Sequence, residues 1–353
     1  MWIKLFVPRF GHHAYAMTDR DRRRVAGWLF LCALLVFAIV LAGGVTRLTR
    51  SGLSIVEWQP LIGVLPPLSH ADWEALFAKY RETPEFRLVN FAMTLEGFKG
   101  IFWWEYIHRL LARGIGLVFL LPLLYFQIAG KLDRALALKL WGIFLLGAAQ
   151  GAMGWIMVQS GLIDDPKVNP VRLAAHLGLA LAIFSAELWI AMQLVSPRVR
   201  PFDKLAAAIP LLIFAMALSG GMVAGLRAGA AYQTFPLMNG HLVPPEVMML
   251  EPWWRNFLYN MATVQLVHRL FFWGLALLIP LAWWRMRHAA AANALFAAFV
   301  LQAALGISTL LMGVPVALGA AHQGGAVLLL AAALWNAHSA GVWPALRRAH
   351  AIA

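Results

Sequence analysis

Long apolar stretches alternate with shorter polar segments along most of this chain of 353 residues. Each stretch holds about 20 residues, which is enough for a helix to cross the ~30 Å hydrocarbon core of a membrane. Because lipid offers the backbone no hydrogen-bond partner, such stretches are expected to be helical. The pattern predicts eight spans, at 26–46, 102–127, 136–159, 172–195, 205–226, 258–284, 290–312 and 316–339.

Basic residues gather in the segments that alternate with these spans. The clusters are Arg20, Arg22, Arg23 and Arg24; Lys131 and Arg134; Arg198, Arg200 and Lys204; Arg285, Arg287 and His288; and Arg347 and Arg348. With eight spans, all five clusters fall on one face. Since Lys and Arg collect in cytoplasmic loops, both termini are predicted to be cytoplasmic.

The opposite face carries two long connections, at about 47–101 and 227–257, which are rich in Pro, Trp and Gly. The first contains the sequence LSHADWEALFAKYRETPEF, which predicts an amphipathic helix capped by Ser69. Several tryptophans of both connections suit the aromatic belt at a membrane interface. They are Trp58, Trp73, Trp103, Trp104, Trp253 and Trp254.

Composition narrows the class of protein. Hydrophobic residues make up 61% and charged residues 13%, so the fold class is an all-α polytopic membrane protein rather than a soluble domain. The net charge of +13 is explained by basic cytoplasmic loops, and we expect no nucleic acid partner. Cys32 is the single cysteine, which excludes an internal disulfide, a thiolate metal cluster and a CxxC pair. The first apolar run continues past residue 40 without a clear cleavage site, so no cleavable signal peptide is expected.

The two halves of the chain resemble each other. Spans one and five end in the GG-containing runs AGGVTRLTRSG and SGGMVAGLRAG, spans two and six carry HR, and spans four and eight carry AAH. Each half has four spans, an even number, so the halves share one orientation and form a parallel repeat. We expect two four-helix bundles side by side, an N-terminal half over 1–200 and a C-terminal half over 201–353.

Four histidines occupy corresponding positions in these halves: His108 and His176 in the first, His268 and His322 in the second. His108 and His176 lie five or six residues into their spans, about 8–9 Å below the outer interface. Two imidazoles facing each other in a four-helix bundle are typical of heme iron ligation. A zinc or di-iron site would need more ligands. For any one histidine, an ordinary interhelical hydrogen bond is the alternative. The other histidines lie at span ends or in loops and are expected to be solvated: His12, His13, His70, His241, His288, His338 and His350.

One carboxylate distinguishes the two halves. Glu105 lies three residues before His108, on the same helix face, whereas Gln265 stands three residues before His268. Beside a bound heme, Glu105 could exchange protons near pH 7. The alternative is a simple pair with Arg109, its i+4 neighbour. Two similar sites with an acid–base residue in only one of them predict one reactive site and one electron-transfer or structural site.

Arg109 and Arg269 each directly follow the first histidine of a pair. Arginines inside a membrane are costly and usually have a partner. Heme propionates and a local carboxylate are both candidate partners, and snorkelling to the interface is the simpler alternative.

These motifs, taken in order, resemble the heme A synthase family. EYIHR, AAH, VHR and AAHQ lie on eight spans, and GGVTRLTRSGLS followed by EWQPLIGVLPPL resembles the mitochondrial and proteobacterial branch. The branch with a cysteine pair in its outer loops is not matched, since Cys32 is alone. The resemblance covers nearly the whole chain.

The resemblance implies oxidation of a methyl group of heme O to a formyl group, giving heme A for terminal oxidase biogenesis. Family members are thought to hydroxylate the methyl group twice, after which the gem-diol loses water. It further implies a heme b cofactor on His268 and His322, with heme O on His108 and His176. Arg269 would then bind the cofactor, Arg109 the substrate, and Glu105 would be catalytic.

The same resemblance implies a bacterial cytoplasmic (inner) membrane location. Candidate partners are membrane lipid, heme O synthase, oxidase assembly factors, a second copy of the chain and an electron acceptor that no motif identifies. The main alternative is a non-enzymatic diheme b-type electron carrier, which needs the four histidines but not Glu105. A repeat-built transporter would need charged groups at the membrane midplane, where this chain has mainly Leu, Ala, Gly and Phe.

Overall fold

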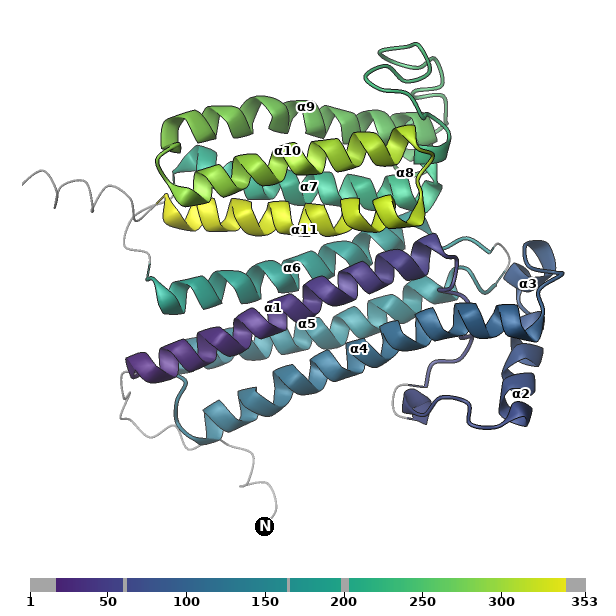
Figure 1. Ribbon diagram of the computed structural model, residues 1–353, viewed down its shortest axis with the longest axis horizontal. Helices are drawn as coiled ribbons and strands as arrows, with labels where there is room; N and C mark the ends of the chain where they lie inside the picture. Colours follow the sequence, from purple (N-terminus) through teal and green to yellow (C-terminus); the bar gives the residue numbers. More distant parts are fainter. Residues whose placement is uncertain (1–16, 60–61, 164–165, 198–202, 341–353) are drawn as a thin grey trace, which may run out of the picture.

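Eight long helices dominate the computed structural model, which describes residues 17–59, 62–163, 166–197 and 203–340. They run side by side along the long axis of the molecule (Figure 1). All eight are long and apolar enough to cross a membrane, as predicted. Their bounds are α1 Asp19–Leu48, α4 Leu95–Ile128, α5 Arg134–Gln159, α6 Pro170–Val195, α7 Lys204–Leu226, α9 Met261–Met286, α10 Ala290–Leu311 and α11 Val316–Ser339.

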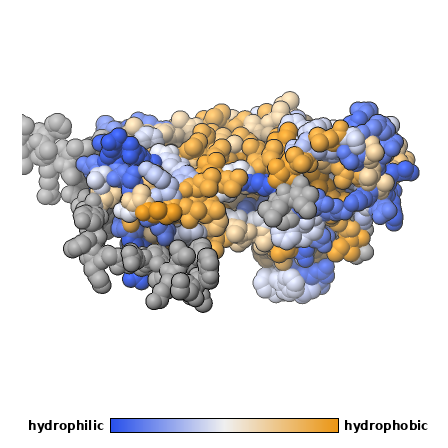
Figure 2. All heavy atoms as spheres, turned by 90° about the horizontal axis from the view of Figure 1, so that it is seen from below, coloured by the Kyte–Doolittle hydropathy of each residue, from blue (hydrophilic) through white to orange (hydrophobic). Residues whose placement is uncertain are grey.

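The surface has the distribution of polarity that a membrane requires. Figure 2 shows a broad hydrophobic belt across the middle of the molecule, with hydrophilic residues gathered toward its two ends. Exposed leucines such as Leu121, Leu211 and Leu277 belong to the middle parts of the long helices. An integral membrane protein built of helices is therefore confirmed.

The long helices contact one another in two rings of four. In the first ring α1 packs against α4 and α6, and α5 also packs against α4 and α6. In the second, α7 packs against α9 and α11, and α10 packs against the same two helices. The rings meet where α1 and α6 contact α11 and where α6 contacts α7. Helices α4 and α6 are therefore diagonal to each other, as are α9 and α11.

The helix α4 begins seven residues earlier than the hydrophobic pattern predicted, at Leu95 instead of 102. Thr94 caps it by accepting a hydrogen bond from the Gly97 amide. The added turns carry Phe98, which is fully buried against the outer connection rather than facing lipid. A span prediction that looks for a lipid-facing stretch cannot find a helix start that is stabilised by packing outside the membrane.

Two other helix starts differ from the prediction by three residues or more. The helix α1 begins at Asp19 instead of 26, because the Thr18 side chain accepts a hydrogen bond from the Asp21 amide. The helix α9 begins at Met261 instead of 258. The extended backbone of Asn260 separates it from the short helix α8, Asn256–Tyr259, and the Asn260 side chain caps α9.

The first outer connection folds into a small helical unit. The predicted amphipathic helix is present as α2, His70–Arg81, and Ser69 with Asp72 forms a capping box at its start. It is followed by α3, Pro84–Leu88. Tyr80 of α2 packs against Phe98 and Phe102 of α4 in a separate apolar cluster. The outer part of α4 is thereby fixed to the segment that precedes it.

The described basic segments lie together at the other end of the molecule. The start of α1, the α4–α5 connection, the start of α7 and the α9–α10 connection are all at one end of the helix array, opposite α2 and α3 (Figure 1). Of the predicted basic clusters, Arg198, Arg200, Arg347 and Arg348 lie outside the described residues.

Candidate functional site

Each of the four histidines faces a glycine on a neighbouring helix. A Cβ atom added to the glycine would lie 2.7–3.2 Å from the histidine Cε1 atom. The pairs are His108 of α4 with Gly43 of α1, His176 of α6 with Gly154 of α5, His268 of α9 with Gly220 of α7, and His322 of α11 with Gly306 of α10. Glycine at these positions lets an imidazole lie directly against a helix backbone, where any other residue would displace it.

The four pairs share one depth. Gly43, Gly154 and Gly306 each lie five residues before the end of their helix, and Gly220 lies six before the end of α7. At 1.5 Å per residue this places all four contacts about 8–9 Å from the helix ends that carry the long connections. The depth agrees with the sequence-based expectation, although α4 itself begins much further out.

Within each half, the two histidines come from diagonal helices of one ring. His108 and His176 are close enough to interact electrostatically, and so are His268 and His322. All four residues are half-buried. Each ring therefore directs two imidazoles toward its interior from opposite sides, at the same level.

A glutamine lies beside the second histidine of each pair. The Gln150 amide nitrogen donates to the His176 carbonyl oxygen at 3.0 Å and lies 3.4 Å from the His176 Nε2 atom. The Gln302 amide nitrogen donates to the His322 carbonyl oxygen at 2.9 Å and lies 3.1 Å from the His322 Nδ1 atom. Each glutamine stands four residues before the glycine that faces the same histidine, so one helix face provides both contacts.

The first histidines of the two pairs differ in their polar contacts. The His268 Nδ1 atom lies 2.8 Å from the Ser219 hydroxyl oxygen. The His108 Nδ1 atom is buried and has no hydrogen-bond partner among the described residues. The two halves thus share a frame of helices and glycines but hold this imidazole differently.

This donor set fits iron porphyrin. Each half offers two imidazoles on opposite sides of a bundle, and such a pair would suit the iron of a heme. Across the described ranges, no group of three or more His, Cys, Asp or Glu residues could hold a metal ion by side chains alone. The four close glycine contacts hold the imidazole groups in place without adding a competing ligand.

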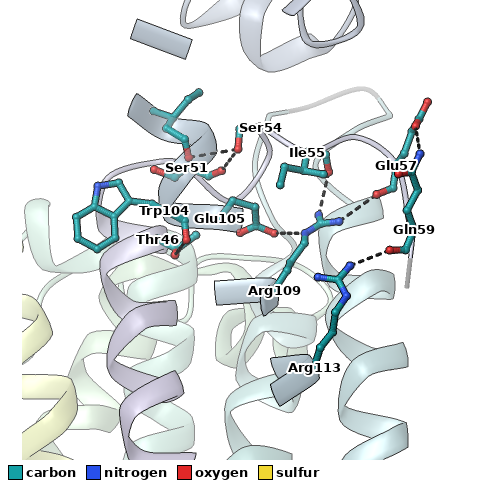
Figure 3. Close-up of polar contacts among 11 residues, drawn as sticks. Thr46, Ser51, Ser54, Ile55, Glu57, Gln59, Trp104, Glu105, Arg109 and Arg113 are labelled. Atoms are coloured by element: carbon teal, nitrogen blue, oxygen red, sulfur yellow. Dashed lines mark hydrogen bonds and ion pairs between the residues drawn. The ribbon is translucent and has the colours of Figure 1, made fainter. Parts of the chain in front are cut away.

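Glu105 is buried one turn before His108 and forms an ion pair with Arg109 (Figure 3). The Arg109 Nε atom lies 2.7 Å from Glu105 Oε1. Its two terminal nitrogens donate to the carbonyl oxygens of Glu57 at 3.0 Å and Ile55 at 2.9 Å. The local carboxylate that was one of the expected partners of Arg109 is therefore Glu105, and the same guanidinium also holds the outer connection.

The other half repeats this arrangement without the carboxylate. Arg269 donates to the carbonyl oxygens of Thr234 at 2.8 Å and Pro236 at 3.0 Å in the second outer connection. The Gln265 amide donates to the Tyr232 carbonyl oxygen at 3.0 Å. Both arginines thus attach a long connection to the helix that bears a histidine. Of the two equivalent side chains, only Glu105 can exchange a proton.

Sequence reasoning missed some of these contacts and misjudged one histidine. Ser219, Gln150 and Gln302 were not singled out, although both glutamines lie within the small-residue runs LGAAQGAMG and LQAALGIST. His338 was expected to be solvated but is 4% exposed, because it packs edge-on against Trp189 at 5.4 Å. His70, His241 and His288 are exposed as expected, and His12, His13 and His350 lie outside the described residues.

Comparison with known proteins identifies the family. The family model described as cytochrome oxidase assembly protein matches residues 26–334. A heme A synthase of Nitrosospira multiformis is 55% identical over 332 residues, covering 90% of this chain and 93% of its own. The heme A synthase of Nitrosomonas eutropha is 52% identical, with 88% and 92% covered, and that of Mesorhizobium japonicum is 46% identical, with 94% and 95% covered. The resemblance seen in the motifs is confirmed, and the chain belongs to the cytochrome oxidase assembly protein family.

Proposed function

We propose that this protein oxidises a methyl group of heme O to a formyl group, giving heme A for terminal oxidase biogenesis. One observation carries the proposal. Each of the four histidines lies against a glycine of a neighbouring helix, but only His108 has a buried carboxylate, Glu105, beside it. Relatives named heme A synthase, 44–55% identical over most of the chain, support the same reaction. The eight apolar helices and the bacterial relatives support a location in the bacterial cytoplasmic (inner) membrane.

The alternative of a non-enzymatic diheme carrier is not supported by these relatives. A carrier also has no use for Glu105, which is 4% exposed and sits in a place where burying a carboxylate is costly. A reaction that uses the Glu105 carboxylate explains its burial better than electron transfer alone does.

The two halves take different roles in this proposal. The N-terminal half, residues 1–200, binds heme O through His108 and His176, and the C-terminal half, residues 201–353, binds a heme b cofactor through His268 and His322. When bound, heme b supplies one-electron transfer. The matching rings of helices support a parallel repeat of the two halves, and the grouping of basic segments at one end supports cytoplasmic termini.

Glu105 acts on the proton that the methyl oxidation releases, or it positions the attacking water. The ion pair with Arg109 holds the carboxylate one helical turn from His108, at the edge of the ring interior. Its other oxygen, Oε2, makes no hydrogen bond to the part of the chain that the structure describes and lies toward Gly52. That oxygen is the one that would receive or hold a proton beside the substrate.

Arg109 and Arg269 bind heme propionates with the donors that remain. A guanidinium has five N–H groups. Arg109 uses three in bonds to Glu105, Glu57 and Ile55, and the Nε atom of Arg269 makes no hydrogen bond within the described residues. Each arginine can therefore hold its loop and a propionate together.

Several partners follow from this reaction. The substrate and product are heme O and heme A, so the chain is expected to meet heme O synthase and oxidase assembly factors within membrane lipid. An electron acceptor takes the electrons removed from the methyl group. On α5, Gly147 and Gly151 are exposed and have nothing within 4 Å of an added Cβ, so this helix face is open for a second copy of the chain.

The test is Glu105→Gln, expressed in a strain that lacks its own enzyme. We expect heme O or a hydroxylated intermediate to accumulate, since the amide keeps the shape but cannot accept a proton. Heme b should stay bound, because His268 and His322 are in the other ring. The pigments are extracted and separated by chromatography.

Glu96→Gln is the matched control, because it makes the same change on the same helix at a side chain that is 79% exposed. It should leave the yield of heme A near that of the unchanged protein. A normal yield of heme A from Glu105→Gln would end the proposal for Glu105. Recovery of protoheme alone from the unchanged protein would instead favour the electron carrier.

A further inference from the structure

The Ser219 hydroxyl lies between a backbone carbonyl oxygen of its own helix and the imidazole of His268. The hydroxyl donates to the Met216 carbonyl oxygen at 2.7 Å, one helical turn earlier in α7. With that hydrogen used, the Ser219 oxygen faces the His268 Nδ1 atom at 2.8 Å as an acceptor. The Nδ1 atom therefore carries the hydrogen, and the lone pair is left on Nε2.

The equivalent position in the first half lacks this group. Ser219 directly precedes Gly220, which faces His268, and Ala42 directly precedes Gly43, which faces His108. The closest approach of an added Cβ to the imidazole is similar in the two, 3.2 Å and 3.0 Å. Yet the His108 Nδ1 atom is buried and has no partner in the described ranges. Two nearly identical packing sites thus differ by one hydroxyl.

We infer that Ser219 is a positioning residue through which His268 would hold its heme without exchange, and that alanine at position 42 would leave His108 as the ligand of an exchangeable heme. The inference rests on the proposed function, in which the second half keeps its cofactor and the first half takes in substrate and releases product. When a ligating histidine donates its other N–H group to an acceptor, that hydrogen bond fixes the orientation of the imidazole and raises its basicity. A ligand without that bond holds iron less firmly, which suits a site that must empty after each reaction.

The experiment uses the purified holoprotein and Ser219→Ala. The rate of heme b loss to excess apomyoglobin should rise about 10–100-fold, the usual effect of removing an outer partner of a metal ligand. The midpoint potential of heme b should rise, because a less basic imidazole stabilises the oxidised iron less well. Ser219→Thr keeps the hydroxyl and should restore both values. A merely structural role for Ser219 would leave the potential unchanged.

Two further variants complete the comparison. Ala42→Ser adds the hydroxyl to the first half and should slow the release of heme O or heme A from it. Ser185→Ala is the matched control, since the Ser185 hydroxyl donates only to the Leu181 carbonyl oxygen of its own helix, at 2.7 Å. It should change neither heme loss nor the potential.

The outcomes separate this inference from the function on which it rests. If Ser219→Ala keeps the heme b loss rate and midpoint potential of the unchanged protein, while His268→Ala loses heme b, the role of Ser219 is overturned and the site assignment stands. If His268→Ala keeps a normal heme b spectrum, the assignment of the cofactor to the second half is itself wrong.

Discussion

The helix faces that hold His108 and His268 can be compared residue by residue. Three positions earlier, both helices carry a buried side chain of the same length, Glu105 in one and Gln265 in the other. One position later, both carry an arginine that attaches an outer connection by its carbonyl oxygens. The comparison shows that the two helices share one frame around their histidines and differ in single polar groups within it. In the proposed function, these polar groups divide the roles of the two halves.

The largest expected effect, and the strongest test of the proposed difference between the two halves, concerns the histidines themselves. His322→Met should remove or strongly disturb the heme b spectrum, whereas His108→Met should leave most of it. The reason is that His322 belongs to the ring assigned to the cofactor and His108 to the ring assigned to substrate. Absorbance spectra of the purified, reduced proteins check this. Equal loss of heme b from both variants would contradict the division of roles.

A smaller effect is expected at the glycines. In Gly306→Ala the new Cβ would lie 2.7 Å from the His322 Cε1 atom, so the imidazole must move. Overpacking of this kind costs about 1–3 kcal/mol, and we expect roughly a tenfold or greater loss of heme b occupancy. Gly220→Ala, at 3.2 Å, should cost less.

The control for this pair is Gly147→Ala, because an added Cβ there meets nothing within 4 Å. Heme b per protein, measured as pyridine hemochrome, should fall in the order Gly147→Ala, Gly220→Ala, Gly306→Ala. An unchanged heme content in Gly306→Ala would show that the close glycine contact does not position the ligand.

The effect expected to matter least for heme binding concerns a difference between the two outer connections. Burial raises the pKa of Glu85 in α3 to about 7, against the opposing influence of the Tyr80 hydroxyl and of Arg50 and Arg227. The folded connection therefore binds this proton more tightly than the unfolded chain does. Its stability should fall as pH rises from about 4.5 to about 7, by up to about 3 kcal/mol, and then level off.

Hydrogen-exchange protection of the α2 and α3 amides, corrected for the intrinsic pH dependence of exchange, measures this. Glu85→Gln should remove most of the pH dependence between pH 5 and 7. The second outer connection should show little of it, since Glu246 and Glu251 there are exposed. Equal pH dependence in both connections would point to a cause other than Glu85.

Much of this architecture could be predicted from hydropathy and histidine spacing, because both are properties of single helices. The eight spans and the shared depth of His108 and His176 are of this kind. Contacts between helices are different. That Gly306 faces His322, or that Ser219 reaches His268, depends on how two helices are rotated about their axes, and small residues alone do not report it.

Two buried polar side chains, one in α6 and one in α11, were likewise not predictable from the sequence. Glu187 is 1% exposed and is followed directly by Leu188 and Trp189 in α6, yet nothing in its neighbours in sequence predicts its burial. His338 lies near the end of α11, which suggested contact with water, but the ring of Trp189 covers it. For His338, a residue from another helix, distant in the sequence, therefore decides the environment.

The bonds of Arg109 have a mechanical consequence. One guanidinium holds the Glu105 carboxylate through Nε and the backbone of residues 55 and 57 through its terminal nitrogens. Any displacement of that outer segment therefore pulls on the cation that neutralises the carboxylate. Displacement of this part of the first outer connection and loss of the Glu105 ion pair are thereby coupled through a single side chain.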